Sequence, residues 1–407
     1  MPVRRAATLA LLALLLPVGL AGWSAPTSAA SSDESATPTD ALPTNVSVHV
    51  TARQRVRLEA LPQIVQYGAG VAGSDAAKAA ITATMRPVRV GRPVRLQVQD
   101  GPSWLDVATG RQDARGRVQL AAAASGPAGG PLTYRVTARR WGGLSAVAGL
   151  PVSTERWLDA TWTDEFSGTE LREAWNHRGR EYVHASRRSC SKGDPRAVRV
   201  ADGAVRLSVI PDPDATTTCR IRGRDATSGR FAYRLNGHVG TEGSFGFRYG
   251  FAAARVKFHR LRGQHGAFWL QPTGGIYPGA LGSEIDVVEY FGDRHPQGGL
   301  ATFTHRYDGR RRVSTGGWVP GSSSYLRSRR DGWSRNYHVF SVEWTPTTLV
   351  FRIDGKETVR MRGNISAVRQ FPILSLIAAD YEIPKIRARR LPQHMYVDWV
   401  RVWETGG

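Results

Sequence analysis

The sequence is poor in cysteine, in long apolar runs and in helical periodicity. Its two cysteines, Cys190 and Cys219, have no cluster of further metal-ligating residues near them, which argues against a cysteine-based metal site. Beyond the first twenty residues, no stretch is long and apolar enough to cross a bilayer. Few segments carry the spacing of an amphipathic helix, whereas many alternate between apolar and polar residues. These absences favour an all-β protein without a membrane span.

Acidic residues are also outnumbered, with 34 Asp and Glu against 55 Lys and Arg and a net charge of +21. Such an excess favours polyanionic partners such as nucleic acid, anionic wall polymers or acidic polysaccharides, although it can equally serve solubility. Basic runs occur at 306–312, 327–330 and 385–390. The aromatic and basic residues form no known nucleic-acid-binding motif, so we expect no specific nucleic-acid partner.

The first thirty residues have the pattern of a secretory signal peptide. Arg4 and Arg5 precede an apolar segment at 6–20, and small residues at 28–30 would suit cleavage. A membrane anchor is the alternative, but the apolar segment is too short to span a bilayer comfortably. We therefore expect a secreted, extracellular protein. In that compartment Cys190 and Cys219 are expected to pair as a structural disulfide.

The rest of the chain divides into a linker and two β-rich parts. Residues 31–44 are rich in Ser, Thr, Asp and Pro and indicate a flexible linker. Short alternating segments at 45–152 predict a small β-sandwich that resembles bacterial immunoglobulin-like accessory modules. Strand-like segments continue through 154–407 and predict one large β-sandwich. We expect the first part to be a spacer and the chemistry to lie in the second.

The stretch SEIDVVEYFG, residues 283–292, carries three acids among aliphatic and aromatic residues typical of a buried strand. A helix would place Glu284 and Glu289 about 140° apart. On a strand, Glu284 and Asp286 share one face, and one extra residue at 287–288 would return Glu289 to it. The spacing therefore predicts a bulged strand with all three carboxylates facing one cleft.

This arrangement suits glycoside hydrolysis. Like charges on one face raise carboxyl pKa values, so at least one acid is expected to hold a proton near neutral pH. A pair of carboxyls with separated pKa values is what this reaction requires. Tyr290 and Phe291 follow directly, as an aromatic platform for a sugar would. The alternative is an exposed strand face whose acids pair with the many arginines.

Several segments resemble glycoside hydrolase family 16, the laminarinase-like β-glucanases. EIDVVE resembles the family's E-x-D-x-x-E signature, WTDEFSGTEL its opening segment, GQHGAFWLQP the strand preceding the acids and MYVDWVRVWE a late strand. The resemblance covers about 156–405 and leaves out the N-terminal part. It implies a jelly-roll sandwich of two curved sheets, with the acids on the concave face.

The resemblance also implies a retaining double displacement. Glu284 would be the nucleophile, Glu289 the acid and base, and Asp286 would hold the proton arrangement between them. A polysaccharide is the implied partner, and β-1,3-glucan is the substrate we expect first.

Four further residues are predicted to contact the substrate. Trp269 and His305 match family positions near the site, with core or supporting positions as their alternatives; Gln271 and Tyr290 complete the prediction. No cofactor is expected to be required. A structural calcium ion fits the resemblance without ligands that can be assigned, and we expect a monomer.

The sequence departs from the family pattern at positions that we expect around the cleft. Ala253 stands where the family often has Glu, His265-Gly266 stands where it often has Trp-Pro, and SLIAADYEIPK replaces a late segment. These departures leave the substrate open between β-1,3-glucan, galactan and an anionic polysaccharide. They also leave open endo or exo action, hydrolysis or transglycosylation, and a non-catalytic carbohydrate-binding protein on the same sandwich.

Overall fold

The strands fall into two groups along the chain. The computed structural model describes residues 44–222 and 228–406, which all lie within one unit, 43–407. The predicted signal peptide, 1–30, and the predicted linker, 31–44, lie outside the described residues except for Thr44.

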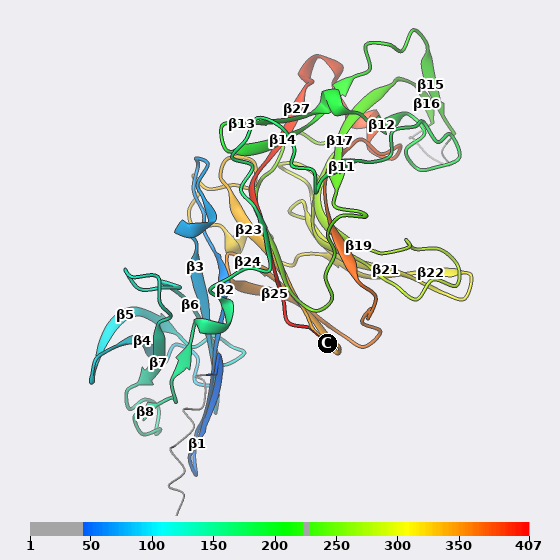
Figure 1. Ribbon diagram of the computed structural model, residues 1–407. Coiled ribbons are helices and arrows are strands. Elements are labelled where there is room, and N and C mark those ends of the chain that lie inside the picture. The colour runs from blue at the N-terminus through cyan, green and yellow to red at the C-terminus, as the bar shows by residue number, and fades with distance from the viewer. Residues whose placement is uncertain (1–43, 223–227, 407) are drawn as a thin grey trace, which may run out of the picture. The chain divides into compact units, whose positions relative to one another are not determined.

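The first group forms two small antiparallel sheets. Their strands are β1 (Val46–Val50), β2 (Arg55–Val65), β3 (Lys78–Arg86), β4 (Pro93–Asp100), β5 (Ser103–Arg111), β6 (Arg117–Ala122), β7 (Thr133–Ala138), β8 (Val147–Ala148) and β9 (Val152–Ser153). One sheet has the order β1-β2-β3-β6, and the other has the order β5-β4-β7-β8 with β9 beside β7 (Figure 1). Inward-facing residues such as Leu58, Ile81, Leu96 and Val136 build their shared core.

The second group forms one large sheet that curls on itself, and a two-stranded hairpin. Its strands are β10 (Trp162–Asp164), β11 (Asn176–His177), β12 (Ser191–Gly193), β13 (Val198–Ala201), β14 (Ala204–Pro211), β15 (Thr218–Ile221), β16 (Gly229–Ala232), β17 (Arg234–Gly240), β18 (Gly250–Lys257), β19 (His265–Pro272), β20 (Glu284–Tyr290), β21 (Leu300–Asp308), β22 (Arg311–Trp318), β23 (His338–Trp344), β24 (Thr348–Ile353), β25 (Lys356–Arg362), β26 (Gln370–Ile377) and β27 (Gln393–Glu404). The main order is β22-β21-β20-β19-β26-β17-β14-β27-β18-β23-β24-β25, and β15 pairs with β16.

Helical structure is limited to short 3-10 turns among the described residues. They are η1 (Ser74–Ala76), η2 (Glu155–Trp157), η3 (Pro195–Ala197), η4 (Ser322–Tyr325), η5 (Ile383–Lys385) and η6 (Ala388–Arg390). In this part of the chain, no helix is long and apolar enough to cross a membrane.

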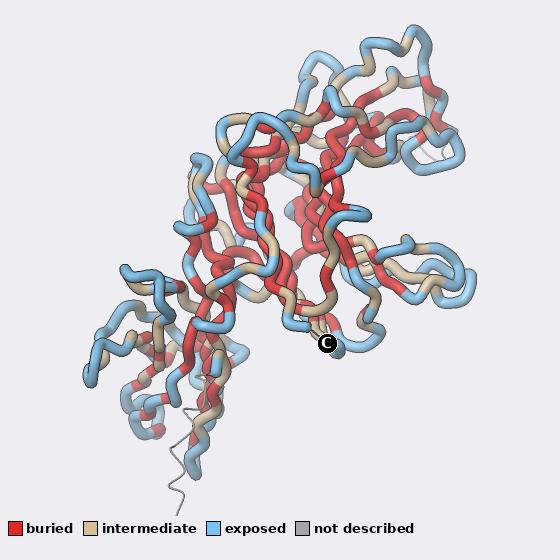
Figure 2. The backbone as a smooth tube through the Cα atoms, in the orientation of Figure 1, coloured by how far each residue is buried: buried red, intermediate tan, exposed pale blue. Residues whose placement is uncertain are grey.

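The two halves of the large sheet enclose an apolar core. Phe268 on β19 and Ile285 on β20 belong to the same buried cluster as Val256 on β18 and Val342 on β23. Figure 2 shows this burial as continuous red along the central strands, with pale blue at the connecting loops. The prediction of an all-β fold with a large curved sandwich is therefore confirmed. The predicted domain boundaries and the immunoglobulin-like character of the first group remain predictions.

One expected cleft position lies elsewhere. Ala253 on β18 is fully buried in a cluster with Ile64 and Trp403. The expectation that it borders the cleft is wrong, because side chains alternate along β18 and this one faces away from the sandwich core that supports the acids.

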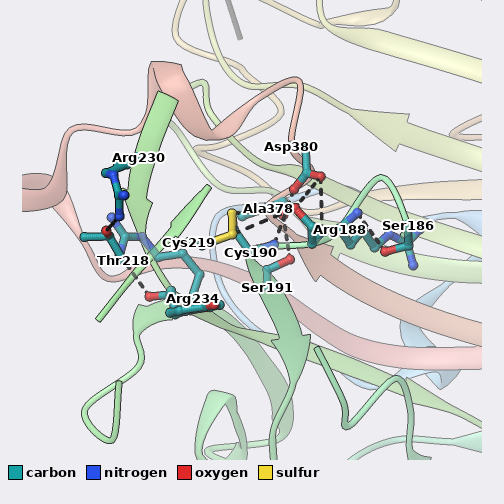
Figure 3. Close-up of a disulfide and its surroundings, with 12 residues drawn as sticks. Ser186, Arg188, Cys190, Ser191, Thr218, Cys219, Arg230, Arg234, Ala378 and Asp380 are labelled. Carbon is teal, nitrogen blue, oxygen red and sulfur yellow. Dashed lines mark hydrogen bonds between the residues drawn. A yellow bond between two sulfur atoms is a disulfide. The ribbon is translucent and has the colours of Figure 1, made fainter. Parts of the chain in front are cut away.

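The predicted cysteine pair is bonded, as Figure 3 shows. The Cα atoms of Cys190 and Cys219 lie 5.4 Å apart. Beside the disulfide, the Ser189 hydroxyl donates to Asp380 Oδ2 at 2.8 Å. These contacts hold the end of the loop at 178–190 that runs beside the cleft.

Candidate active site

Strand β20 carries the predicted bulge. Against β21, the three-residue step from Asp286 to Glu289 spans only a two-residue step, from Phe303 to Ala301. Against β19, the pairing passes over Val287. Both registers confirm an extra residue at 287–288.

The bulge sorts the side chains of β20 between two faces. Ile285, Val287 and Val288 are buried in the sandwich core. Glu284, Asp286 and Glu289 together line one cavity of about 340 Å³. The prediction that all three carboxylates face one cleft is confirmed.

A row of side chains continues this face across the sheet. Ala267 on β19 lies opposite Glu289, Ser375 on β26 lies opposite Ala267, and His238 on β17 lies opposite Ser375. Trp269 also lines the cavity; its Nε1 donates to Ser375 Oγ at 3.2 Å, and its ring stacks on His238 with centroids 6.0 Å apart. The structure therefore places the predicted Trp269 beside the acids.

The predicted His305 lies on the other side of the acids. It stands opposite Glu284 on the neighbouring strand β21, and its Nε2 is 3.2 Å from Asp286 Oδ2. Its Nδ1 is 2.7 Å from Ser314 Oγ, which fixes the ring plane. His305 thus contacts the middle carboxylate and borders a wider cleft of about 1160 Å³.

Burial and mutual repulsion favour protonation of the three acids. Burial, and next the charge of Asp286, raise the pKa of Glu284 to about 7. Burial, and next the charge of Glu289, raise the pKa of Asp286 well above its usual range. Burial also raises the pKa of Glu289, against the opposing charge of His265. Near neutral pH, this group therefore holds protons as well as charge.

The predicted role of Tyr290 in substrate binding is wrong. Tyr290 is 1% exposed in the sandwich core, and its hydroxyl donates to Asp293 Oδ1 at 2.5 Å. After the bulge, strand alternation turns Glu289 to the cleft and Tyr290 to the opposite face. Aromatic side chains that do line the wider cleft include Phe291, Tyr307, Trp318 and Tyr381.

Comparisons with known proteins agree with this geometry. Residues 216–400, which include the bulged strand, match the family described as Glycosyl hydrolases family 16. The C-terminal region of the chain belongs to this family. The resemblance that the E-x-D-x-x-E signature suggested is therefore confirmed.

Two curated relatives are similar to this chain within the family. Glucan endo-1,3-beta-glucosidase A1 of Niallia circulans is 26% identical over 61% of this chain and 38% of the relative. Glucan endo-1,3-beta-glucosidase of Cryptopygus antarcticus is 28% identical over 47% of this chain and 65% of the relative. The chain thus spans less than two thirds of the length of either protein.

Among solved structures, the laminarinase catalytic domain of Thermotoga maritima aligns over 61% of this chain and 99% of that chain, with 18% identity and a TM-score of 0.48. Endo-beta-1,3-glucanase of Pyrococcus furiosus aligns over 60% and 92%, with 19% identity and a TM-score of 0.47.

Two departures from the family 16 pattern meet in the structure. His265 belongs to the His-Gly pair that replaces Trp-Pro, and Glu382 belongs to the substituted segment SLIAADYEIPK. Nδ1 of His265 lies 2.5 Å from Oε2 of Glu382. Nε2 of the same ring is 3.9 Å from Glu289 Oε1. The neighbouring Gly266 is closely packed, since a Cβ there would lie 2.7 Å from Met395 Sδ. The departures were visible in the sequence, but their contact was not, since 117 residues separate them.

The family 16 cleft of this chain is also basic. Arg178, Arg188 and Arg312 line the inner cavity together with the three acids. Gln271, predicted to contact substrate, lines it too and accepts a hydrogen bond from Arg178 Nη2 at 2.7 Å. Arg312 belongs to the basic run at 306–312, whereas no motif marked Arg178 or Arg188 in the sequence.

Glu284, Asp286 and His305 could share a metal ion, since one ligand atom from each lies within 4.8 Å of the others. Two carboxylates and an imidazole suit a transition metal better than calcium, which prefers oxygen ligands. The same three groups are also what the expected acid–base chemistry uses. The structural calcium ion suggested by the resemblance remains a prediction.

Proposed function

We propose that this chain is a retaining endo-glycosidase that hydrolyses a β-linked polysaccharide, with β-1,3-glucan as the first substrate to test. The observation that carries the proposal is the bulge in β20, which brings Glu284, Asp286 and Glu289 onto one cavity wall in the family 16 region. The names of the two glucanase relatives support the choice of β-1,3-glucan.

In the first step, the Glu284 carboxylate attacks the anomeric carbon of the bound sugar. The bond between that carbon and the leaving oxygen breaks, and Glu289 gives its proton to this oxygen. In the second step, water attacks the anomeric carbon from the vacated side and gives its proton to Glu289. The ester bond to Glu284 breaks, so the configuration at the anomeric carbon is retained.

Asp286 and His305 support the nucleophile in this mechanism. Asp286 lies between the two glutamates in sequence, and its raised pKa keeps a proton on it that can be donated to a neighbouring carboxylate. His305 contacts Asp286 and, through Ser314, is held in one orientation. The nucleophile is thereby stabilised as the carboxylate at the moment of attack.

The test combines one variant with a panel of polymers. Glu284→Gln should lower the release of reducing sugar from laminarin, lichenan or agarose by on the order of a thousandfold or more while the folded far-UV spectrum is retained. The exposed Glu170→Gln is the matched control. Proton NMR of the first product should show retained configuration, and an inverted product would overturn the double displacement.

Binding to an insoluble glucan with no product after long incubation would instead support a non-catalytic carbohydrate-binding protein. The retention of all three acids in one cavity favours the enzyme over that alternative.

The chain is further proposed to act outside the cell. The Cys190–Cys219 disulfide supports this, because structural disulfides persist in oxidising compartments. Expression with residues 1–30 attached should yield a secreted product that begins after the small residues at 28–30, and retention of the full chain inside the cell would contradict the proposal.

A further inference from the structure

Three arginines from two parts of the chain, the loop at 178–190 and β22, reach the cavity that holds the carboxylates. Arg178 follows β11, Arg188 lies in the loop that ends at the disulfide, and Arg312 lies on β22. Since β11 and β22 belong to opposite sides of the concave sheet, the cations stand on both sides of the acids.

Arg178 is held rigidly. Its guanidinium pairs with Glu242, donates to Gln271 Oε1 at 2.7 Å and lies 5.0 Å from the Phe371 ring centroid. Its Nε is buried without a hydrogen-bond partner among the described residues. The contacts with Glu242 and Gln271 fix the Arg178 guanidinium at the cavity wall.

Arg188 is the least engaged cation. Among the described residues, no hydrogen bond or ion pair joins its guanidinium to another side chain, yet its charge lowers the pKa of each of Glu284, Asp286 and Glu289. Its backbone is held nearby by the Cys190–Cys219 disulfide and by Asp380, as Figure 3 shows. A free cation on an anchored backbone is suited to meet a ligand.

Arg312 makes only a loose pair on the other side. Its Nη2 lies 3.8 Å from Glu284 Oε1, and its side chain is 45% exposed. Arg187 and Lys192 add cations to the wider cleft, which Glu181 also lines. Within the described part of the chain, Arg188 and Arg312 therefore make no close ion pair with the cavity acids, the nearest being the one at 3.8 Å.

The cations that line the cavity are poorly paired with its acids. Three arginines and three carboxylates line it, yet among the described residues the one ion pair between the two sets joins Arg312 to Glu284, at 3.8 Å. Because arginine stays charged and these guanidinium groups keep donors that the cavity acids do not use, a negative group on a sugar would find partners here.

We infer that the substrate carries anionic groups, carboxylate or sulfate ester, on sugars next to the bond that is cleaved, and that Arg178, Arg188 and Arg312 bind them. The inference rests on the proposed function, since it names the substrate class of the same cleft. Arginine suits both groups because its planar fork of donors matches carboxylate and sulfate oxygens.

The test compares ligands that differ only in charge. The Glu284→Gln protein is titrated by calorimetry with β-1,3-glucan oligosaccharides in neutral, carboxymethylated and sulfated form at about 0.15 M salt. Each anionic form should bind at least about tenfold more tightly than the neutral form. The two anionic arms then distinguish carboxylate from sulfate.

A second variant tests the residues. Adding Arg188→Gln should lower the ratio of anionic to neutral affinity by about tenfold, whereas the exposed Arg140→Gln, a matched charge loss outside the cleft, should leave that ratio unchanged. Equal or weaker binding of both anionic forms, no binding of either, or a ratio that Arg188→Gln does not change would overturn the inference.

Failure of the proposed function looks different. If no polymer, neutral or anionic, yields product with the unmodified protein, the hydrolase is rejected while the affinity ratio still decides the anionic site. If neutral glucan is cleaved at least as well as its anionic derivatives, the hydrolase stands and the inference falls.

Discussion

The imidazole of His265 is bonded to the carboxylate of Glu382, with Nδ1 2.5 Å from Oε2. The second ring nitrogen of His265, Nε2, lies 3.9 Å from Glu289 Oε1. Although burial works against a charged imidazole, the carboxylates of Glu382 and Glu289 raise the pKa of His265 overall. Glu289, the proposed acid and base, thus lies beside an imidazole whose charge depends on pH.

This contact predicts a pH effect. Burial is the largest cause that raises the pKa of Glu289, and Glu382 also raises this pKa. The charges of His265, His305 and Arg188 lower it. His265→Gln should therefore let the pKa of Glu289 rise, and the alkaline limb of kcat/KM should move up by about one pH unit.

The carboxylate of Asp286, whose pKa the charge of Glu289 raises, remains beside Glu289 in the variant, so the limb reports the group of acids as a whole. His49→Gln in the N-terminal sheets is the control and should leave the limb in place. If the alkaline limb of kcat/KM does not move in His265→Gln, and Tm is unchanged, the proposed role of the His265–Glu382 pair is contradicted.

Arg312 should influence the pH at which kcat/KM rises on the acidic side of its profile. Glu284 must be ionised to attack, and its pKa of about 7 places the rise in kcat/KM near neutral pH. Arg312 lowers this pKa, so Arg312→Gln should shift the rise to higher pH and reduce activity at pH 6 by several-fold. Arg310→Gln, an exposed change in the same hairpin, should have no such effect. A uniform loss at all pH values would show that Arg312 acts otherwise.

Loss of the disulfide should weaken both the fold and the cleft. Replacing Cys190 and Cys219 by Ser removes a link across 29 residues, which corresponds to about 3–4 kcal/mol in the chain-entropy model. The loop carrying Arg188 loses one of its two anchors, so KM should rise more than kcat falls. Thermal unfolding and steady-state kinetics below the new Tm measure these effects; unchanged KM would show that Asp380 alone positions the loop.

Local pattern predicted the strand, the bulge and the disulfide well. Side chains alternate strictly along a strand, so offsets of two and five among Glu284, Asp286 and Glu289 are compatible with one face only if a residue is inserted. The same rule, applied beyond the bulge, places Tyr290 in the core, because the position along the strand and not the aromatic character of the side chain decides which face it takes.

The surroundings of the acids could not be predicted in the same way. Ala253 was expected at the cleft but lies on the far face of its sheet, whereas Glu382, from a segment without any motif, reaches His265. Arg178 and Arg188 approach from a loop, where no periodicity indicates which way a side chain points.

The sequence by itself determined which acids lie together, because side chains alternate along a single strand and the spacing of the three acids fits one face once a residue is inserted. The tertiary structure alone decided which charges surround them. His265, Glu382, Arg188 and Arg312 belong to four separate segments, and only the curling of the sheet and the anchoring of the loop at Cys190 bring their charges close enough to shift the pKa values of Glu284 and Glu289.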